Sequence, residues 1–155
     1  MHVIKYEARL DDDGFVTLNT VFSKYVPGIE NHFKTQSEVY ELCQALKMGS
    51  YSEEHAFLLC FGGRNMLKGF FEIGIGNIDT CIVDIRGIAQ KVLLLNTHYM
   101  ILVHNHPSGD PTPSELDYKA SNKLKQLGEL LEIPFEDSII LGNDTYASFK
   151  EDGLL

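Results

Sequence analysis

Two short apolar runs constrain the fold of this chain more than any other feature. Ala56–Phe61 and Tyr99–Val103 contain no charged or strongly polar residue. A strand that is buried on both faces has a continuous apolar run of this kind, whereas a strand with one wet face alternates. We therefore expect two internal strands of a sheet that is covered on both sides. Both runs are far too short to cross a bilayer, which argues against a membrane protein.

Three other segments have the apolar spacing of helices that would cover such a sheet. The first and last begin with the capping boxes Thr35-x-x-Glu38 and Thr112-x-x-Glu115. Pro113 suits the first position of the last helix. The expected buried positions are Val39, Leu42, Cys43 and Leu46; Ile88, Val92 and Leu95; and Leu116, Ala120, Leu124, Leu127 and Leu131.

The start of the chain has a different pattern. Apolar and polar residues alternate over Ile4–Leu10, Asp11–Gly14 is a turn signal, and Phe15–Leu18 is expected to return as a hairpin partner. Residues 23–34 read as a connection. The remaining expected segments are a strand at Met66–Ile73, a loop at Gly74–Thr80 and short strands at Ser138–Leu141 and Tyr146–Phe149.

These elements predict an α/β fold with a mixed sheet flanked by helices. The length of 155 residues suits one domain rather than two. We expect an N-terminal strand hairpin extension at residues 1–34 and a main domain at residues 35–155.

The net charge and the cysteine content narrow the range of possible functions and cellular locations. The net charge is −9, which argues against direct nucleic-acid binding because such proteins need basic side chains to displace counterions from phosphates. The first residues lack the apolar segment of a secretory signal. The three cysteines, Cys43, Cys60 and Cys81, include no Cys-x-x-Cys pair. We expect reduced, buried thiols in a cytoplasmic protein.

The stretch from His104 to Asp117 carries the chemistry. His104 and His106 are two apart at the end of an expected strand, so period-two geometry points both imidazoles to one side. Ser114 and Asp117 are three apart in the first turns of the expected helix and share a face. A strand end and a helix start can thus bring two nitrogens and one oxygen to a single point.

Two histidines and one carboxylate are typical of catalytic zinc, with the fourth position open to water. Such hydrolysis also needs a carboxylate that is not a ligand, to move the proton of the water, and a donor for the developing oxyanion. Ser114 is a candidate for the donor. Glu53 and Glu54 precede the first buried run and should point to opposite faces, so only one of them can be the base.

Each of these residues also has an ordinary explanation. The histidines could form a satisfied turn pair, Asp117 could complement a helix N-terminus, and Glu53 and Glu54 could be solvated. Taken singly, these explanations are preferable. The combination His-x-His, seven residues, Ser, two residues and Asp is specific.

This combination resembles the metal motif of the JAMM/MPN (JAB) metallohydrolases. The string His-Asn-His-Pro-Ser-Gly-Asp-Pro-Thr-Pro-Ser is similar to the RadC branch of that superfamily. The resemblance runs from about Thr35 to Leu155. Further similar segments are Glu53–Phe57, Gly76-Asn77-Ile78-Asp79 beside the branch's Gly-Thr-Leu-Asp loop, Ser148-Phe149 and Gly153–Leu155.

The resemblance implies a JAMM/MPN (cytidine-deaminase-like) three-layer fold and assigns roles. The implied zinc ligands are His104, His106 and Asp117. Ser114 would steady the tetrahedral intermediate. Glu54 aligns with the catalytic glutamate of the family, and on that alignment we prefer it to Glu53.

Three features depart from the RadC branch. Its members commonly carry an N-terminal helix-hairpin-helix module, whereas residues 1–34 have the pattern of a strand hairpin. Its His-Pro-Arg appears as Asp84-Ile85-Arg86, and its late Asp-His pair appears as Asp137-Ser138. None of these changes touches an implied zinc ligand, but they bear on substrate and DNA recognition.

The favoured hypothesis is a zinc-dependent metallopeptidase-like hydrolase of amide or isopeptide bonds, acting on a protein, a peptide or a small amide. The alternative is a noncatalytic or accessory factor in DNA repair or recombination, as the RadC name implies. An HNH nuclease is set aside because its motif is not a contiguous tripeptide. The chain is too short for a TIM-barrel amidohydrolase.

Overall fold

The computed structural model describes residues 1–76 and 84–155. Its centre is a seven-stranded mixed sheet with the strand order β2-β1-β4-β3-β5-β6-β7. In chain order the elements are β1 (His2–Leu10), β2 (Val16–Tyr25), α1 (Gln36–Ala45), β3 (His55–Phe61), the 3-10 turn η1 (Gly63–Asn65), β4 (Leu67–Ile75), α3 (Ile85–Leu94), β5 (Tyr99–Asn105), α4 (Glu115–Leu131), β6 (Phe135–Leu141) and β7 (Tyr146–Ser148).

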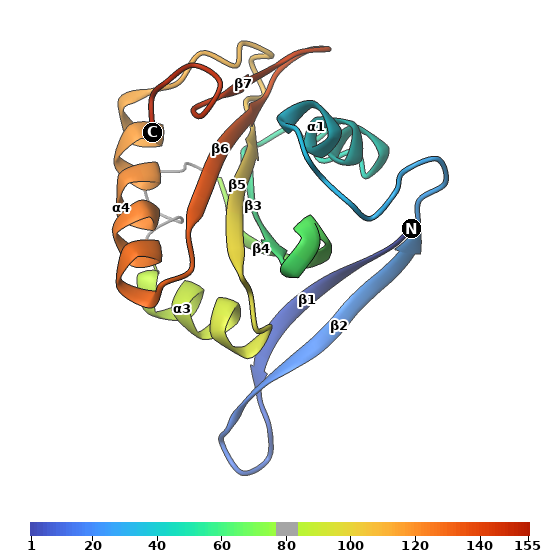
Figure 1. The fold of residues 1–155 in the computed structure, drawn as a ribbon, viewed down its shortest axis with the longest axis vertical. Coiled ribbons are helices and arrows are strands. Elements are labelled where there is room, and N and C mark those ends of the chain that lie inside the picture. Colours follow the sequence, from blue (N-terminus) through green and yellow to red (C-terminus); the bar gives the residue numbers. More distant parts are fainter. Residues whose placement is uncertain (77–83) are drawn as a thin grey trace.

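Helices cover both faces of the sheet, as the apolar runs predicted. Helix α1 lies on one side, and α3 and α4 lie on the other (Figure 1). Every residue of β3 is buried, and so is every residue of β5 except Tyr99. The predicted α/β class and the three-layer arrangement are confirmed.

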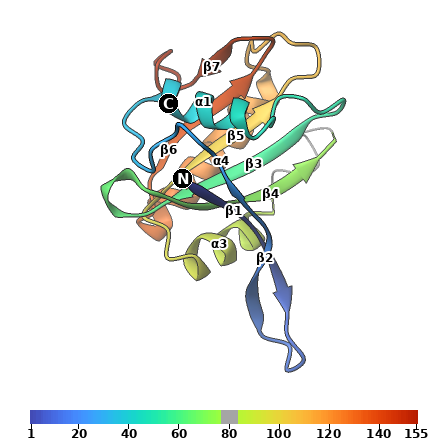
Figure 2. The same cartoon turned by 90° about the vertical axis from the view of Figure 1, so that its right-hand side faces the viewer.

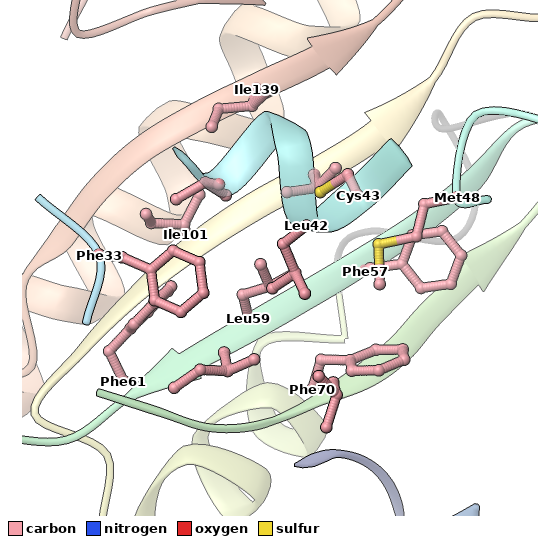
Figure 3. Packing of buried hydrophobic residues seen from close by; sticks show 14 of the residues in the cluster. Phe33, Leu42, Cys43, Met48, Phe57, Leu59, Phe61, Phe70, Ile101 and Ile139 are labelled. Atoms are coloured by element: carbon pink, nitrogen blue, oxygen red, sulfur yellow. The ribbon is translucent and has the colours of Figure 1, made fainter. Parts of the chain in front are cut away.

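Two apolar clusters fill the spaces between the layers. On the α1 side, Leu42 and Leu59 pack among the rings of Phe33, Phe57 and Phe70 (Figure 3). On the other side, Val92 of α3 and Leu124 of α4 belong to one buried cluster with Leu58, Phe71 and Leu102 of the sheet. Full burial of one such side chain contributes about 1.5–3 kcal/mol. The middle of the sheet is therefore a stable platform for the polar residues at the ends of its strands.

The start of α4 differs from the prediction. The helix begins at Glu115 with Ser114 as the N-cap, so the predicted box of Thr112 with Glu115 is wrong. Asp110 accepts hydrogen bonds from both the backbone N–H and the hydroxyl of Thr112, at 2.9 and 2.6 Å. Pro113 also disfavours helical backbone at the residue before it. Ser114 is thus the first residue that is free to cap the helix.

Several strands are longer than predicted, among them β2, β4, β5 and β6. Strand β2 continues to Tyr25, because β1 pairs along its whole length and places His2 opposite Tyr25. The sequence alone assigned residues 23–25 to a connection. Strand β4 continues to Ile75, which pairs with His55. Tertiary pairing extends β2 and β4 beyond their local pattern.

The N-terminal hairpin of β1 and β2 joins the sheet along a short segment. Lys5 and Tyr6 pair in parallel with Phe70 and Phe71 of β4, and the outer end of the hairpin projects from the body (Figure 2). At Gly69 the two strands come very close. A Cβ atom there would lie 2.7 Å from the carbonyl oxygen of Ile4 and 2.5 Å from the Tyr6 ring.

Some predictions concern residues that the structure does not describe. Residues 77–79 of the Gly76–Asp79 segment and Cys81 lie outside the described ranges. Cys43 and Cys60 are free and buried, and burial raises the pKa of each thiol to about 12. Across residues 1–76 and 84–155, no helix is long and apolar enough to span a bilayer.

Candidate metal site

The pairing of β3 with β5 positions the site. Ala56 lies opposite His104 in this antiparallel pair. If this register continues by two more residues, Glu54, which precedes β3, lies opposite His106, which follows β5. Both residues are just outside the regular ladder of hydrogen bonds. Side chains two apart share a face. His104, His106 and Glu54 therefore belong to the face that α3 and α4 cover.

Helix α4 brings the third side chain to the two histidines. The Nε2 atom of His104 lies 3.0 Å from Oδ1 of Asp117, and Nε2 of His106 lies 3.5 Å from Oδ2. The two Nε2 atoms are 3.2 Å apart. The predicted convergence of His104, His106 and Asp117 is confirmed, and the group could hold a metal ion.

The donor set fits a divalent cation. Oδ1 of Asp117 is buried and accepts no hydrogen bond within the described part of the chain, although a histidine nitrogen is 3.0 Å away. A buried carboxylate oxygen without a partner is unfavourable, and a cation would supply that partner. Tetrahedral ligand bonds of 2.0–2.2 Å separate ligand atoms by about 3.3–3.6 Å. The separations of 3.0 Å between His104 Nε2 and Asp117 Oδ1 and of 3.2 Å between the two histidine nitrogens are slightly shorter than that spacing.

A backbone carbonyl orients His106. Its Nδ1 lies 2.7 Å from the carbonyl oxygen of Asp110. Because a carbonyl only accepts, Nδ1 carries the hydrogen and the lone pair of the neutral ring is at Nε2, toward Asp117. Histidine ligands of metals usually have such an outer partner. The sequence analysis missed this contact, although the turn residues between His106 and Asp110 were a signal that the chain folds back.

The N-terminus of α4 orients Asp117. Its Oδ2 accepts two hydrogen bonds from Ser114, one from the backbone N–H and one from the hydroxyl, each of 2.7 Å. The Asp117 N–H donates back to the Ser114 hydroxyl at 3.2 Å. Oδ2 therefore accepts the bonds of the helix cap and lies nearest His106, while Oδ1 faces His104. Ser114 lies next to the site as predicted, and its hydroxyl proton points to Asp117.

The charges of the group are mutually stabilising. Burial alone would raise the pKa of Asp117, but the imidazoles of His104 and His106 outweigh it and hold this pKa well below its ordinary value. The same carboxylate raises the pKa of His106, with a smaller contribution from the charge of Glu54.

The two candidate glutamates lie in different surroundings. The Glu53 side chain is 61% exposed, and its carboxylate lies 3.9 Å from Nε2 of His55. Glu54 is half-buried, and its charge acts on His106. Of the two, Glu54 is thus the one whose charge acts on the candidate metal site.

Asp84 and Asp137, which stand where the sequence departs from the RadC motifs, both accept hydrogen bonds that stabilise the fold. Asp84 caps α3 by accepting the Gly87 N–H at 2.9 Å. Asp137 is buried and accepts a 2.6 Å hydrogen bond from the Ser148 hydroxyl and a 3.0 Å bond from the Lys150 N–H. Asp137 therefore ties the end of the chain to β6.

Comparison with known proteins agrees with this geometry. Residues 33–154 match the family model described as a RadC-like JAB domain. The chain belongs to this family, within the RadC branch of the JAB/MPN superfamily. The mixed sheet between helix layers is consistent with the fold of that superfamily.

Several curated relatives have similar sequences. A UPF0758 protein from Chlorobaculum parvum is 32% identical over 132 residues, covering 85% of this chain and 59% of the relative. One from Clostridium kluyveri is 38% identical over 109 residues, covering 70% and 48%. One from Clostridium botulinum is 34% identical over 138 residues, covering 89% and 60%. The chain thus spans about half to three fifths of the length of these relatives.

Proposed function

We propose that this RadC-like domain is a zinc-dependent hydrolase of amide or isopeptide bonds, acting on a protein, a peptide or a small amide. One observation carries the proposal: two imidazoles and a buried carboxylate converge, and Oδ1 of that carboxylate has no hydrogen-bond partner among the described residues. Glu54 on the same face adds a carboxylate that is not needed as a ligand. The buried free thiols support a cytoplasmic location for this activity.

His104, His106 and Asp117 would hold the zinc ion. When bound, zinc supplies a Lewis acid and lowers the pKa of a coordinated water toward about 7. The Glu54 carboxylate takes one proton from the attacking water. The same carboxyl group then donates that proton to the nitrogen of the leaving amine, so that Glu54 returns to its initial state.

Ser114 is the proposed donor to the oxyanion. Its hydroxyl points to Asp117 in this structure, so it must turn toward the substrate when negative charge develops there. The Ser114 N–H still donates to Oδ2 of Asp117 after this rotation. The helix cap therefore keeps the metal ligand in place while the hydroxyl changes its partner.

Metal analysis combined with two variants tests the proposal. The purified protein should contain about one zinc ion per chain, and His104→Ala should lose it. Glu54→Gln should keep the metal and lose turnover of fluorogenic aminoacyl amides and isopeptide-linked peptides. Absence of any bound transition metal in the wild type contradicts the proposal. DNA binding that persists after zinc removal would favour the accessory-factor alternative.

A further inference from the structure

Asn105 lies between the two histidines but faces the other way. Strand geometry sends His104 and His106 to one side of the sheet and the Asn105 side chain to the opposite side. Asn105 is fully buried. Its amide oxygen accepts the backbone N–H of His55 at 2.8 Å, and its amide nitrogen donates to the carbonyl oxygens of Glu53 and Tyr51 at 3.1 and 3.3 Å.

These hydrogen bonds surround Glu54. The Glu53 carbonyl and the His55 N–H are the backbone groups on either side of Glu54, and Asn105 holds both. The Glu54 carbonyl accepts the Gly76 N–H at 2.8 Å. Residues 50–54 lie outside the strands, so the bonds from Asn105 replace a regular ladder where β3 and β5 separate.

From these contacts we infer that Asn105 is a positioning residue, which sets the distance between the Glu54 carboxylate and the metal site. The inference rests on the proposed hydrolase function. His104, Asn105 and His106 are consecutive in one chain segment, so a movement of this segment carries the ligands and the clamp on Glu54 together. The base then keeps its place relative to the metal ligands.

The clamp needs the chemistry of an amide. One oxygen accepts from His55, and one NH₂ group donates to two carbonyl oxygens. An aspartate at this position keeps the acceptor but turns a second oxygen toward the two carbonyls. A leucine has a similar volume and makes none of these bonds. Either change leaves the carbonyl oxygens of Tyr51 and Glu53 without this donor.

Variants of two asparagines provide the test. Asn105→Leu and Asn105→Asp remove the clamp. Asn31→Leu is the matched control, because the Asn31 amide also bonds two backbone groups. Its oxygen accepts the N–H of Leu67 at 2.7 Å, and its nitrogen donates to the carbonyl oxygen of Leu67 at 3.2 Å. Leu67 pairs with Phe61, at the other end of β3 from Glu54 and about 20 Å away along the strand.

The first readout is the hydrogen exchange of peptides covering residues 50–56 in the zinc-loaded protein. We expect exchange there to become at least about tenfold faster in both Asn105 variants, while zinc content stays at that of the wild type. Asn31→Leu should leave this segment unchanged. Unchanged exchange in the Asn105 variants overturns the inference, whether or not a substrate of the protein is known.

The second readout is a double-mutant cycle with Glu54→Gln on a fluorogenic amide. Asn105→Leu should lower kcat about 10–100-fold with KM unchanged, and should change the residual rate of Glu54→Gln less than about twofold, because both changes remove the same contribution. A purely structural role would lower both rates by the same factor, and that result overturns the inference. Loss of zinc from the wild type, or a fully active Glu54→Gln, would instead contradict the proposed function.

Discussion

The N-termini of α1 and α4 have the same local structure and different surroundings. In α1 the Thr35 hydroxyl accepts the Glu38 N–H at 3.3 Å, and the Glu38 carboxylate accepts the Thr35 N–H at 3.0 Å. In α4 the same reciprocal bonds join Ser114 and Asp117, at 3.2 and 2.7 Å. Each acidic residue uses one carboxylate oxygen for two donors.

The difference lies in the second carboxylate oxygen. Asp117 is 1% exposed and faces two histidines at the end of β5, whereas the box of Thr35 and Glu38 is at the protein surface. The capping box alone stabilises a helix. The same box beside two imidazoles also fixes a candidate metal ligand, so the two boxes differ by their position in the fold.

The largest expected difference between the two boxes is in metal binding. Asp117→Asn removes the charge of a ligand, and we expect the purified protein to lose its bound metal. Glu38→Gln makes the matching change at α1 and should keep about one metal ion per chain. Elemental analysis after dialysis measures both. Equal metal content in the two variants would remove the distinction between the boxes.

The cap hydroxyls should show a smaller contrast. Ser114→Ala and Thr35→Ala should each lower the free energy of unfolding of the metal-free protein by about 1 kcal/mol, because each removes a helix N-cap. Only Ser114→Ala should also weaken metal affinity, by about 10–100-fold, since it removes one of the two hydrogen bonds that orient Oδ2 of Asp117. Competition with a chromogenic chelator measures this affinity. A similar loss in Thr35→Ala would mean that the effect comes from general destabilisation.

The pH dependence of the metal-free protein should show a still smaller effect. Asp117 raises the pKa of His106 above its ordinary value of 6.5. The stabilisation from this pair is complete below pH 6.5 and is lost as the pH rises through the higher folded value. Urea unfolding in EDTA at pH 6, 7 and 8 should therefore show falling stability. Asp117→Asn should flatten that part of the profile, and an unchanged slope would contradict the assignment.

The smallest effect concerns the surface box. Hydrogen bonds from the N–H groups of Lys34 and Thr35 lower the pKa of Glu38 below its ordinary value of 4.5. Its contribution to stability is present above pH 4.5 and is lost as the pH falls through the lower folded value. Thermal unfolding of Glu38→Gln between pH 3 and pH 6 should show a slightly weaker acid dependence than that of the wild type. If Glu38→Gln changed the acid dependence of stability more than Asp117→Asn changes the dependence near neutral pH, the expected order of these two effects would be contradicted.

Much of the fold and the metal group could be predicted because the signals are local. The buried strands β3 and β5 are continuous apolar runs, and His104 with His106 follows the strand period. The spacing of Ser114 and Asp117 placed both at the start of a helix. These features need only the geometry of one strand or one helical turn.

The remaining features depend on contacts between distant segments. The separate surroundings of Glu53 and Glu54 follow from the register of β3 with β5, which brings Ala56 opposite His104. The partners of Asn105 are 50–54 residues away along the chain. The start of α4 was mispredicted for another reason, since the Asp110 side chain holds Thr112, and Ser114, which was expected within the first turn, caps the helix instead.

The close approach at Gly69 links the hairpin to the rest of the molecule. Any L-residue other than glycine at this position would place a carbon atom against the backbone of β1 and the ring of Tyr6. A single methyl group would therefore act as a wedge between β1 and β4. The attachment of the projecting arm thus depends on the absence of a side chain at this one position.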